Sequence, residues 1–117
     1  ISLIGCEGFR DEGKRAMMGE IAQKLSDIVM VTSVDPRGQL ETINRQIIKG
    51  AKRTGAKIGK NFFTIDDRKE AINTAIKKYA KEGDTVGIFG KGHEKTIDLD
   101  GKNEIAWSDR EAVKEVI

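Results

Sequence analysis

The chain has 117 residues, of which 38% are hydrophobic and 34% are charged, and its 21 basic and 19 acidic side chains leave a formal net charge of +2 at pH 7. This length fits one domain with a single core, and interleaved charges of both signs exclude the basic footprint of a protein that binds nucleic acid or a membrane surface. One cysteine and one histidine exclude a disulfide framework and argue against a zinc site, and no signal peptide or run of 18 apolar residues occurs. We therefore expect a cytoplasmic domain with no metal of its own. As a separate expectation, we take the isolated domain to be a monomer.

In chain order, the first half alternates apolar runs with helical stripes. A strand is expected at 2–4, and the residues that recur next at the spacing of one helical face are Met18, Ile21, Ala22 and Leu25. A continuous apolar run at 28–31 predicts a strand that is covered on both faces. The second helical stripe consists of Leu40, Ile43, Ile47 and Ala51. We expect every member of these stripes to lie in the core.

The second half continues the alternation. A strand is expected at 62–65, and Asp67 and Glu70 are spaced as a helix start. The apolar face of that helix consists of Ile72, Ala75, Ile76 and Tyr79. A fourth strand at 85–89 precedes a hairpin of 97–99 with 104–106, and Ser108 with Glu111 opens a last helix. The sequence predicts an α/β fold in which a mostly parallel sheet carries helices on both faces, with a small antiparallel hairpin near the C-terminus.

Three loops that follow predicted strands are unusually polar, namely 5–15, 32–38 and 90–94. In a parallel sheet they emerge at one edge, where open α/β sheets bind their ligands. Arginine binds carboxylates bidentately and a carboxylate receives an ammonium, so together the loops suit a small zwitterion or dicarboxylate. Taken singly, each loop could equally be a solvated turn. His93 has no paired nucleophile and is not expected to act as a general base.

Two nucleotide-binding patterns are absent. No G-x-x-x-x-G-K-[ST] segment occurs, and Gly5, Gly8 and Gly13 do not have the spacing of the dinucleotide fingerprint G-x-G-x-x-G. The second absence disfavours a nucleotide-dependent oxidoreductase. We expect a chain that can bind a small molecule but cannot activate ATP alone.

The three loops read GCEGFRDEGKR at 5–15, TSVDPR at 32–37 and GKGHE at 90–94. In this order and at these intervals they resemble the C-terminal domain of the Mur ligases, of the MurE type that joins an amino acid to a UDP-N-acetylmuramoyl dipeptide. The resemblance extends over essentially all 117 residues. It implies a Rossmann-like domain, residues 1–117, that belongs to a longer three-domain enzyme and is inactive alone.

By motif position, the resemblance assigns binding of the incoming amino acid to Arg10, Asp35, Arg37, Gly90 and Glu94. The possible supporting residues are Pro36, Lys91, Gly92 and His93, and no catalytic residue or metal ligand is implied. ATP, Mg²⁺ and the UDP-linked peptide would bind mainly to the central and N-terminal domains of the full enzyme.

The turn at 34–37 reads Val-Asp-Pro-Arg where the family pattern is Asp-Asn-Pro-Arg. Arg37 resembles the arginine that diaminopimelate-adding members have at this position of the turn. Asp35, in contrast, brings a negative charge where the family pattern has a neutral amide. The added amino acid therefore stays open between meso-diaminopimelate, lysine and another residue. A stand-alone, non-catalytic module that binds an amino acid or a nucleotide is the alternative reading.

Overall fold

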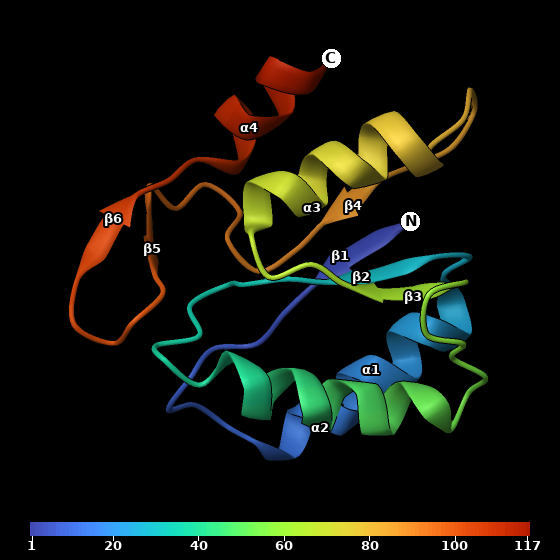
Figure 1. Ribbon diagram of the computed structural model, residues 1–117, viewed down its shortest axis with the longest axis horizontal. Helices are drawn as coiled ribbons and strands as arrows, with labels where there is room; N and C mark the ends of the chain where they lie inside the picture. Colours follow the sequence, from blue (N-terminus) through green and yellow to red (C-terminus); the bar gives the residue numbers. More distant parts are fainter.

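A four-stranded parallel sheet forms the middle layer of the computed structural model, which describes residues 1–117 (Figure 1). Its strands are β1 (Ser2–Ile4), β2 (Val29–Val31), β3 (Phe62–Thr64) and β4 (Gly87–Ile88), in the order β3-β2-β1-β4. All three neighbouring pairs are parallel, which confirms the predicted fold class. The strand expected at 85–89 is shorter than predicted, because only two of its residues pair with β1.

Helices cover both faces of the sheet. On one face lie α1 (Gly13–Leu25) and α2 (Leu40–Lys52), and on the other lie α3 (Arg68–Thr74) and α4 (Asp109–Val116) (Figure 1). A short π-helical segment, η1 (Ala75–Tyr79), continues α3. None of these helices has the length and apolar character needed to cross a membrane.

The predicted hairpin is present beside the layers. Its strands are β5 (Thr96–Asp98) and β6 (Glu104–Ala106), which pair antiparallel (Figure 1). β5 begins and ends one residue earlier than predicted, whereas β6 has the predicted bounds. The hairpin follows β4 in the chain, so it begins at the edge of the sheet that carries the polar loops.

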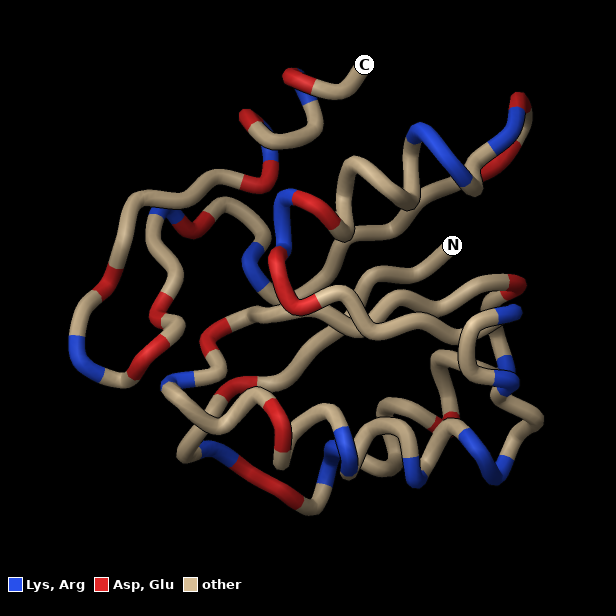
Figure 2. The backbone as a smooth tube through the Cα atoms, in the orientation of Figure 1, with Lys and Arg blue, Asp and Glu red and all other residues tan.

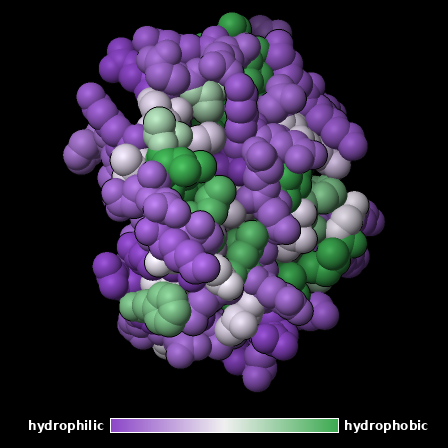
Figure 3. Space-filling view, turned by 60° about the vertical axis from the view of Figure 1, so that its left-hand side comes forward, coloured by the Kyte–Doolittle hydropathy of each residue, from purple (hydrophilic) through white to green (hydrophobic).

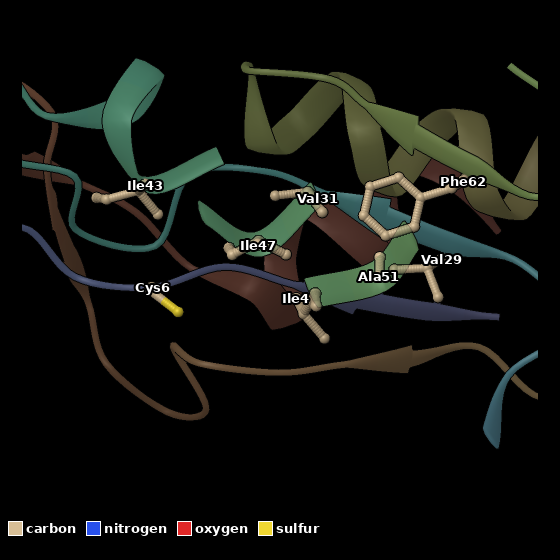
Figure 4. Close-up of a cluster of buried hydrophobic side chains, with 8 residues drawn as sticks. All are labelled: Ile4, Cys6, Val29, Val31, Ile43, Ile47, Ala51 and Phe62. Carbon is tan, nitrogen blue, oxygen red and sulfur yellow. The ribbon is translucent and has the colours of Figure 1, made fainter. Parts of the chain in front are cut away.

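Alternate residues of the strands feed two separate cores. Ile4, Val29 and Val31 pack with residues of α2, including Ile43 and Ile47 (Figure 4). Leu3 and Met30 point to the opposite face, where the core contains Ala71, Ile72, Ala75 and Ala112. Burial on both faces explains why β2 is a continuous apolar run.

Two predicted helix starts are confirmed by side-chain caps. The Asp67 carboxylate accepts a hydrogen bond from the backbone N–H of Glu70 at 2.9 Å, and the Ser108 hydroxyl accepts one from that of Glu111 at 3.2 Å. Each cap satisfies a backbone donor that the helix itself leaves without a partner.

The expected core role of the α1 stripe is wrong for two of its four residues. Ile21 is 48% exposed and Leu25 is 77% exposed. The rotation of α1 is set by its close approach to α2, where a Cβ atom on Gly19 or Gly50 would collide with backbone of the other helix. This approach turns Gly19 inward and leaves Ile21 and Leu25 toward solvent.

Candidate functional site

The loops that follow β1, β2 and β4 leave the sheet at one edge, because these strands are adjacent and parallel. The backbone N–H of Gly8 donates to the carbonyl oxygen of Asp35 at 2.8 Å, which joins the first loop to the second. Lys91 reaches from the third loop to the Asp35 side chain. The expectation that the three polar loops share one edge is confirmed, and Figure 2 shows charges of both signs along them.

Lys91 is the centre of a carboxylate cluster. Its side chain is 1% exposed, and its Nζ lies 3.0 Å from both carboxylate oxygens of Asp35 and 2.7 Å from Oε2 of Glu94. Burial by itself would lower the pKa of Lys91, but the hydrogen bonds and charges of Glu94 and Asp35 outweigh it and raise that pKa. Lys91 is therefore a fixed cation that orients two carboxylates.

The Asp35 carboxylate is almost fully engaged by the protein. Besides its contacts with Lys91, its Oδ1 accepts a hydrogen bond from the backbone N–H of Asp98 at 2.8 Å. The Glu94 carboxylate uses Oε2 on Lys91, and its side chain is half exposed. Of the two carboxylates, Glu94 is the one that can receive a ligand.

Glu7 lies between the two arginines of the edge. Its Oε2 is 3.2 Å from Nε of Arg10 and 3.6 Å from Nη1 of Arg37. Arg37 also donates from Nη1 to the Gly8 carbonyl oxygen at 2.9 Å, and its Nε is 3.7 Å from Oδ2 of Asp98. Arg10 is more exposed, at 57% of its side chain.

The turn that carries Arg37 is held by backbone hydrogen bonds. Arg37 has a φ of 50°, in the left-handed region that a non-glycine residue rarely adopts. Its N–H donates to the carbonyl oxygen of Asp98 at 3.1 Å, and the N–H of Gly38 donates to that of Leu99 at 2.8 Å. Pro36 is fully buried beside them. The hairpin thus fixes the direction in which Arg37 leaves the backbone.

The remaining predicted residues belong to the third loop. Gly90 has a φ of 105°, and a Cβ atom there would also lie 2.7 Å from a methyl group of Val34, so both its conformation and its close contact require glycine. Gly92 has a φ of 52°. His93 is exposed and its imidazole makes no hydrogen bond within the chain. His93 contributes nothing to the contacts that organise the edge.

Sequence patterns did not identify Arg68 and Arg15 as residues that hold the loops. Arg68 donates to the carbonyl oxygens of Ser33 at 3.0 Å and Phe89 at 3.1 Å, which ties the loop after β2 to the end of β4. Arg15 donates from Nη2 to the Glu7 carbonyl oxygen at 3.0 Å. Both guanidinium groups are buried, which their positions at the starts of α3 and α1 gave no reason to expect.

The loop edge is not the most hollowed part of the surface. A hollow of about 910 Å³ lies beside α2 and β3, and its lining includes Glu41, Arg45, Lys49 and Asp66. Figure 3, in which the hairpin side of Figure 1 comes forward, shows a mostly hydrophilic face with separate hydrophobic patches. The assignment of the loop edge as the candidate site rests on its convergent charged groups.

No group of three or more His, Cys, Asp or Glu side chains in the chain is arranged to hold a metal ion.

Comparisons with known proteins show which proteins the chain is similar to. The family model described as "Mur ligase, glutamate ligase domain" matches residues 1–92. A UDP-N-acetylmuramoyl-L-alanyl-D-glutamate–2,6-diaminopimelate ligase of Clostridium acetobutylicum is 41% identical over 118 aligned residues, which are 100% of this chain and 23% of that protein. A UDP-N-acetylmuramyl-tripeptide synthetase of Borreliella burgdorferi is also 41% identical, over 100% of this chain and 22% of that protein.

A solved structure of a UDP-N-acetylmuramoyl-L-alanyl-D-glutamate–2,6-diaminopimelate ligase superposes with a TM-score of 0.80 at 34% identity, covering 99% of this chain and 23% of that one. The chain thus spans less than a quarter of the length of these relatives. Its match to the family model and its similarity to these ligases over its whole length identify the chain as a member of the Mur ligase family.

Proposed function

We propose that this chain is the amino-acid-binding C-terminal domain of a ligase that adds a diamino acid, meso-diaminopimelate or lysine, to a UDP-linked muramoyl dipeptide. The observation that carries this proposal is a single contact network at the loop edge. It joins residues of all three loop motifs, in the order Arg10, Glu7, Arg37, Asp98, Asp35, Lys91 and Glu94. The names of the two relatives describe the same reaction class.

The arginines of the network suit a carboxylate of the incoming amino acid. A guanidinium presents several N–H donors in a planar fork that matches a carboxylate. Arg10 is half exposed, with its Nε on Glu7 and only a long hydrogen bond from Nη1, 3.4 Å from the Phe9 carbonyl oxygen. Its fork can therefore accept a ligand oxygen without breaking a short contact.

Glu94 suits an ammonium group of the same ligand. Lys91 fixes Oε2 of its carboxylate, the side chain is half exposed, and the other oxygen makes no hydrogen bond or ion pair within the chain. An ammonium placed there would form a charge-assisted hydrogen bond, and such bonds contribute about 1.5–3 kcal/mol each. In this proposal Asp35, with Lys91, holds Glu94 in position, and Gly90 lets the loop pass close to Val34.

The loop edge offers little support for binding ATP with Mg²⁺ in this domain. The one buried lysine of the glycine-rich loop is already paired with two carboxylates, and no carboxylate group is clustered for a metal ion. We propose that ATP, Mg²⁺ and the UDP-linked peptide bind to other domains of a three-domain enzyme. On this proposal residues 1–117 form a single domain that binds and orients the amino acid, is monomeric and inactive alone, and works in the cytoplasm.

The test uses the full-length protein with ATP, Mg²⁺, the UDP-linked dipeptide and one amino acid at a time. We expect ATP-dependent formation of the tripeptide with a diamino acid, and a raised KM for that amino acid in Arg10→Ala. Arg45→Ala is the matched control, because Arg45 is an exposed arginine of α2, away from the loop edge, whose side-chain hydrogen bond is to Thr42. Equal effects of the two substitutions would contradict the assigned site.

The same assay separates the ligase from a stand-alone binding module. A module of that kind would bind an amino acid in a calorimetric titration but would form no tripeptide and consume no ATP. Binding without turnover would therefore replace the ligase proposal with the module.

A further inference from the structure

Glu7 occupies the position between the two arginines that a ligand carboxylate would need. Its Oε2 lies within 3.6 Å of both guanidinium groups, and its side chain is 30% exposed. The contact with Arg37 joins residues from different loops, so it is not a local pair within one turn. Glu7 is thus an internal counter-ion at the edge that the proposed function gives to the amino acid.

The backbone around Glu7 is fixed, which makes this position reproducible. Its carbonyl oxygen accepts a hydrogen bond from the buried guanidinium of Arg15 at 3.0 Å. The next residue, Gly8, packs against the turn so closely that a Cβ atom there would collide with the carbonyl oxygen of Pro36. These contacts bring the first loop against the Arg37 turn, so that the Glu7 side chain can reach Arg37.

The charges of the network are unequal in number. The cations are Arg10, Arg37 and Lys91, and the carboxylates that contact them are Glu7, Asp35, Glu94 and Asp98. The excess is one negative charge. A ligand that brings a net positive charge would balance the network, whereas a second ligand carboxylate, beyond the one that the Nη groups of Arg10 can accept, would have to displace Glu7 from Arg37.

We propose that Glu7 is a specificity-determining residue that disfavours a dicarboxylic diamino acid and favours one with a single carboxylate, such as lysine. In this arrangement Arg10 and Arg37 hold Glu7, one ammonium of the ligand lies against Glu94 and the other lies against Glu7. The inference rests on the proposed ligase function and names the substrate class of its site.

The experiment compares lysine and meso-2,6-diaminopimelate in the full-length protein, with kcat/KM measured for each and calorimetric titration of each as a second readout. The wild type should prefer lysine. Glu7→Gln removes the charge and keeps the shape, so the ratio of kcat/KM for diaminopimelate to that for lysine should rise at least tenfold. The titrations should show the same change in relative affinity.

Asp11→Asn is the matched control, because Asp11 is an exposed carboxylate of the same loop whose Oδ1 accepts only the local N–H of Gly13, a contact that asparagine keeps. It should leave the ratio unchanged. A wild type that prefers diaminopimelate, or a ratio that moves less than twofold in Glu7→Gln, would overturn the role of Glu7 and leave the ligase function standing. A wild type that joins neither amino acid would overturn both.

Discussion

Arg68 and Asp109 form a buried bidentate ion pair between the starts of α3 and α4. Nε of Arg68 donates to Oδ1 of Asp109 at 2.8 Å, and Nη2 donates to Oδ2 at 2.9 Å. The same guanidinium donates to the carbonyl oxygens of Ser33 and Phe89, at the ends of β2 and β4. One side chain therefore joins the terminal helix to the edge of the sheet that carries the candidate site.

Asp109→Asn should destabilise the chain strongly. The substitution leaves the Arg68 charge buried without its partner, and breaking a buried ion pair in this way costs about 3–5 kcal/mol. Urea unfolding followed by circular dichroism measures the loss. Glu115→Gln removes an exposed pair with Lys69 instead and should leave the free energy of unfolding nearly unchanged. Similar losses of unfolding free energy in both variants would show that the burial of the Arg68–Asp109 pair does not set its contribution to stability.

Gly50→Ala should separate α1 from α2. The added Cβ atom would collide with the Ala16 backbone, so one helix must shift, and overpacking of this kind costs at least about 1–3 kcal/mol. Lys49→Ala, one residue earlier on the exposed side of α2, is the control. The midpoint of urea unfolding should fall for Gly50→Ala alone. An unchanged midpoint would mean that the two helices have room to adjust.

Lys91→Met should destabilise the chain with a defined pH dependence. It leaves the Asp35 carboxylate with one fewer partner in a buried position, at a cost of about 1–3 kcal/mol. The folded-state pKa of Lys91 is raised above its ordinary value of 10.5. The stability that the charged Lys91 contributes is therefore fully present below pH 10.5 and is lost as pH rises through the folded-state pKa.

The difference in unfolding free energy between wild type and Lys91→Met should therefore be constant from neutral pH to about pH 10 and shrink only in stronger alkali. Unfolding curves of both proteins at each pH measure it. A difference that already declines near pH 8 would show that Lys91 is not held as a cation by its two carboxylates.

The isolated 117-residue chain should neither release phosphate from ATP nor form a peptide bond. Its glycine-rich loop lacks the phosphate-loop pattern, and the lysine of that loop is held by Asp35 and Glu94. Phosphate release by the purified chain, with the full-length protein as the positive control, measures this. ATP turnover by the chain alone would contradict the proposed division of roles between domains.

Local patterns in the sequence predicted the parts of the fold that depend on neighbouring residues. The apolar runs marked the strands, and Asp67 and Ser108 marked two helix starts, since a cap and its helix lie within a few residues. The exposure of Ile21 and Leu25 was missed because the rotation of α1 depends on the glycine contact with α2, far along the chain.

For the candidate site, too, the sequence predicts the local features but not the contacts between distant parts of the chain. The three polar loops could be read from the sequence, and parallel pairing then brought them to one edge. The pairing of Glu7 with Arg37 could not be predicted, because it depends on the packing of Gly8 against the Pro36 turn. No periodicity or motif carries information about a contact of this kind between two loops.

Arg37→Ala in the full-length protein should raise the KM for the amino acid and leave the KM for ATP unchanged. Arg37 either binds a ligand carboxylate or holds Glu7 in place, and loss of a charge-assisted contact of about 1.5–3 kcal/mol corresponds to roughly one to two orders of magnitude in KM. Arg45→Ala, which removes an exposed arginine of α2, should change neither KM. Steady-state kinetics with each substrate varied in turn distinguishes these outcomes. An amino-acid KM that stays flat in Arg37→Ala would show that the contacts of Arg37 with Gly8 and Asp98 serve only the turn, and that Arg37 takes no part in binding the amino acid.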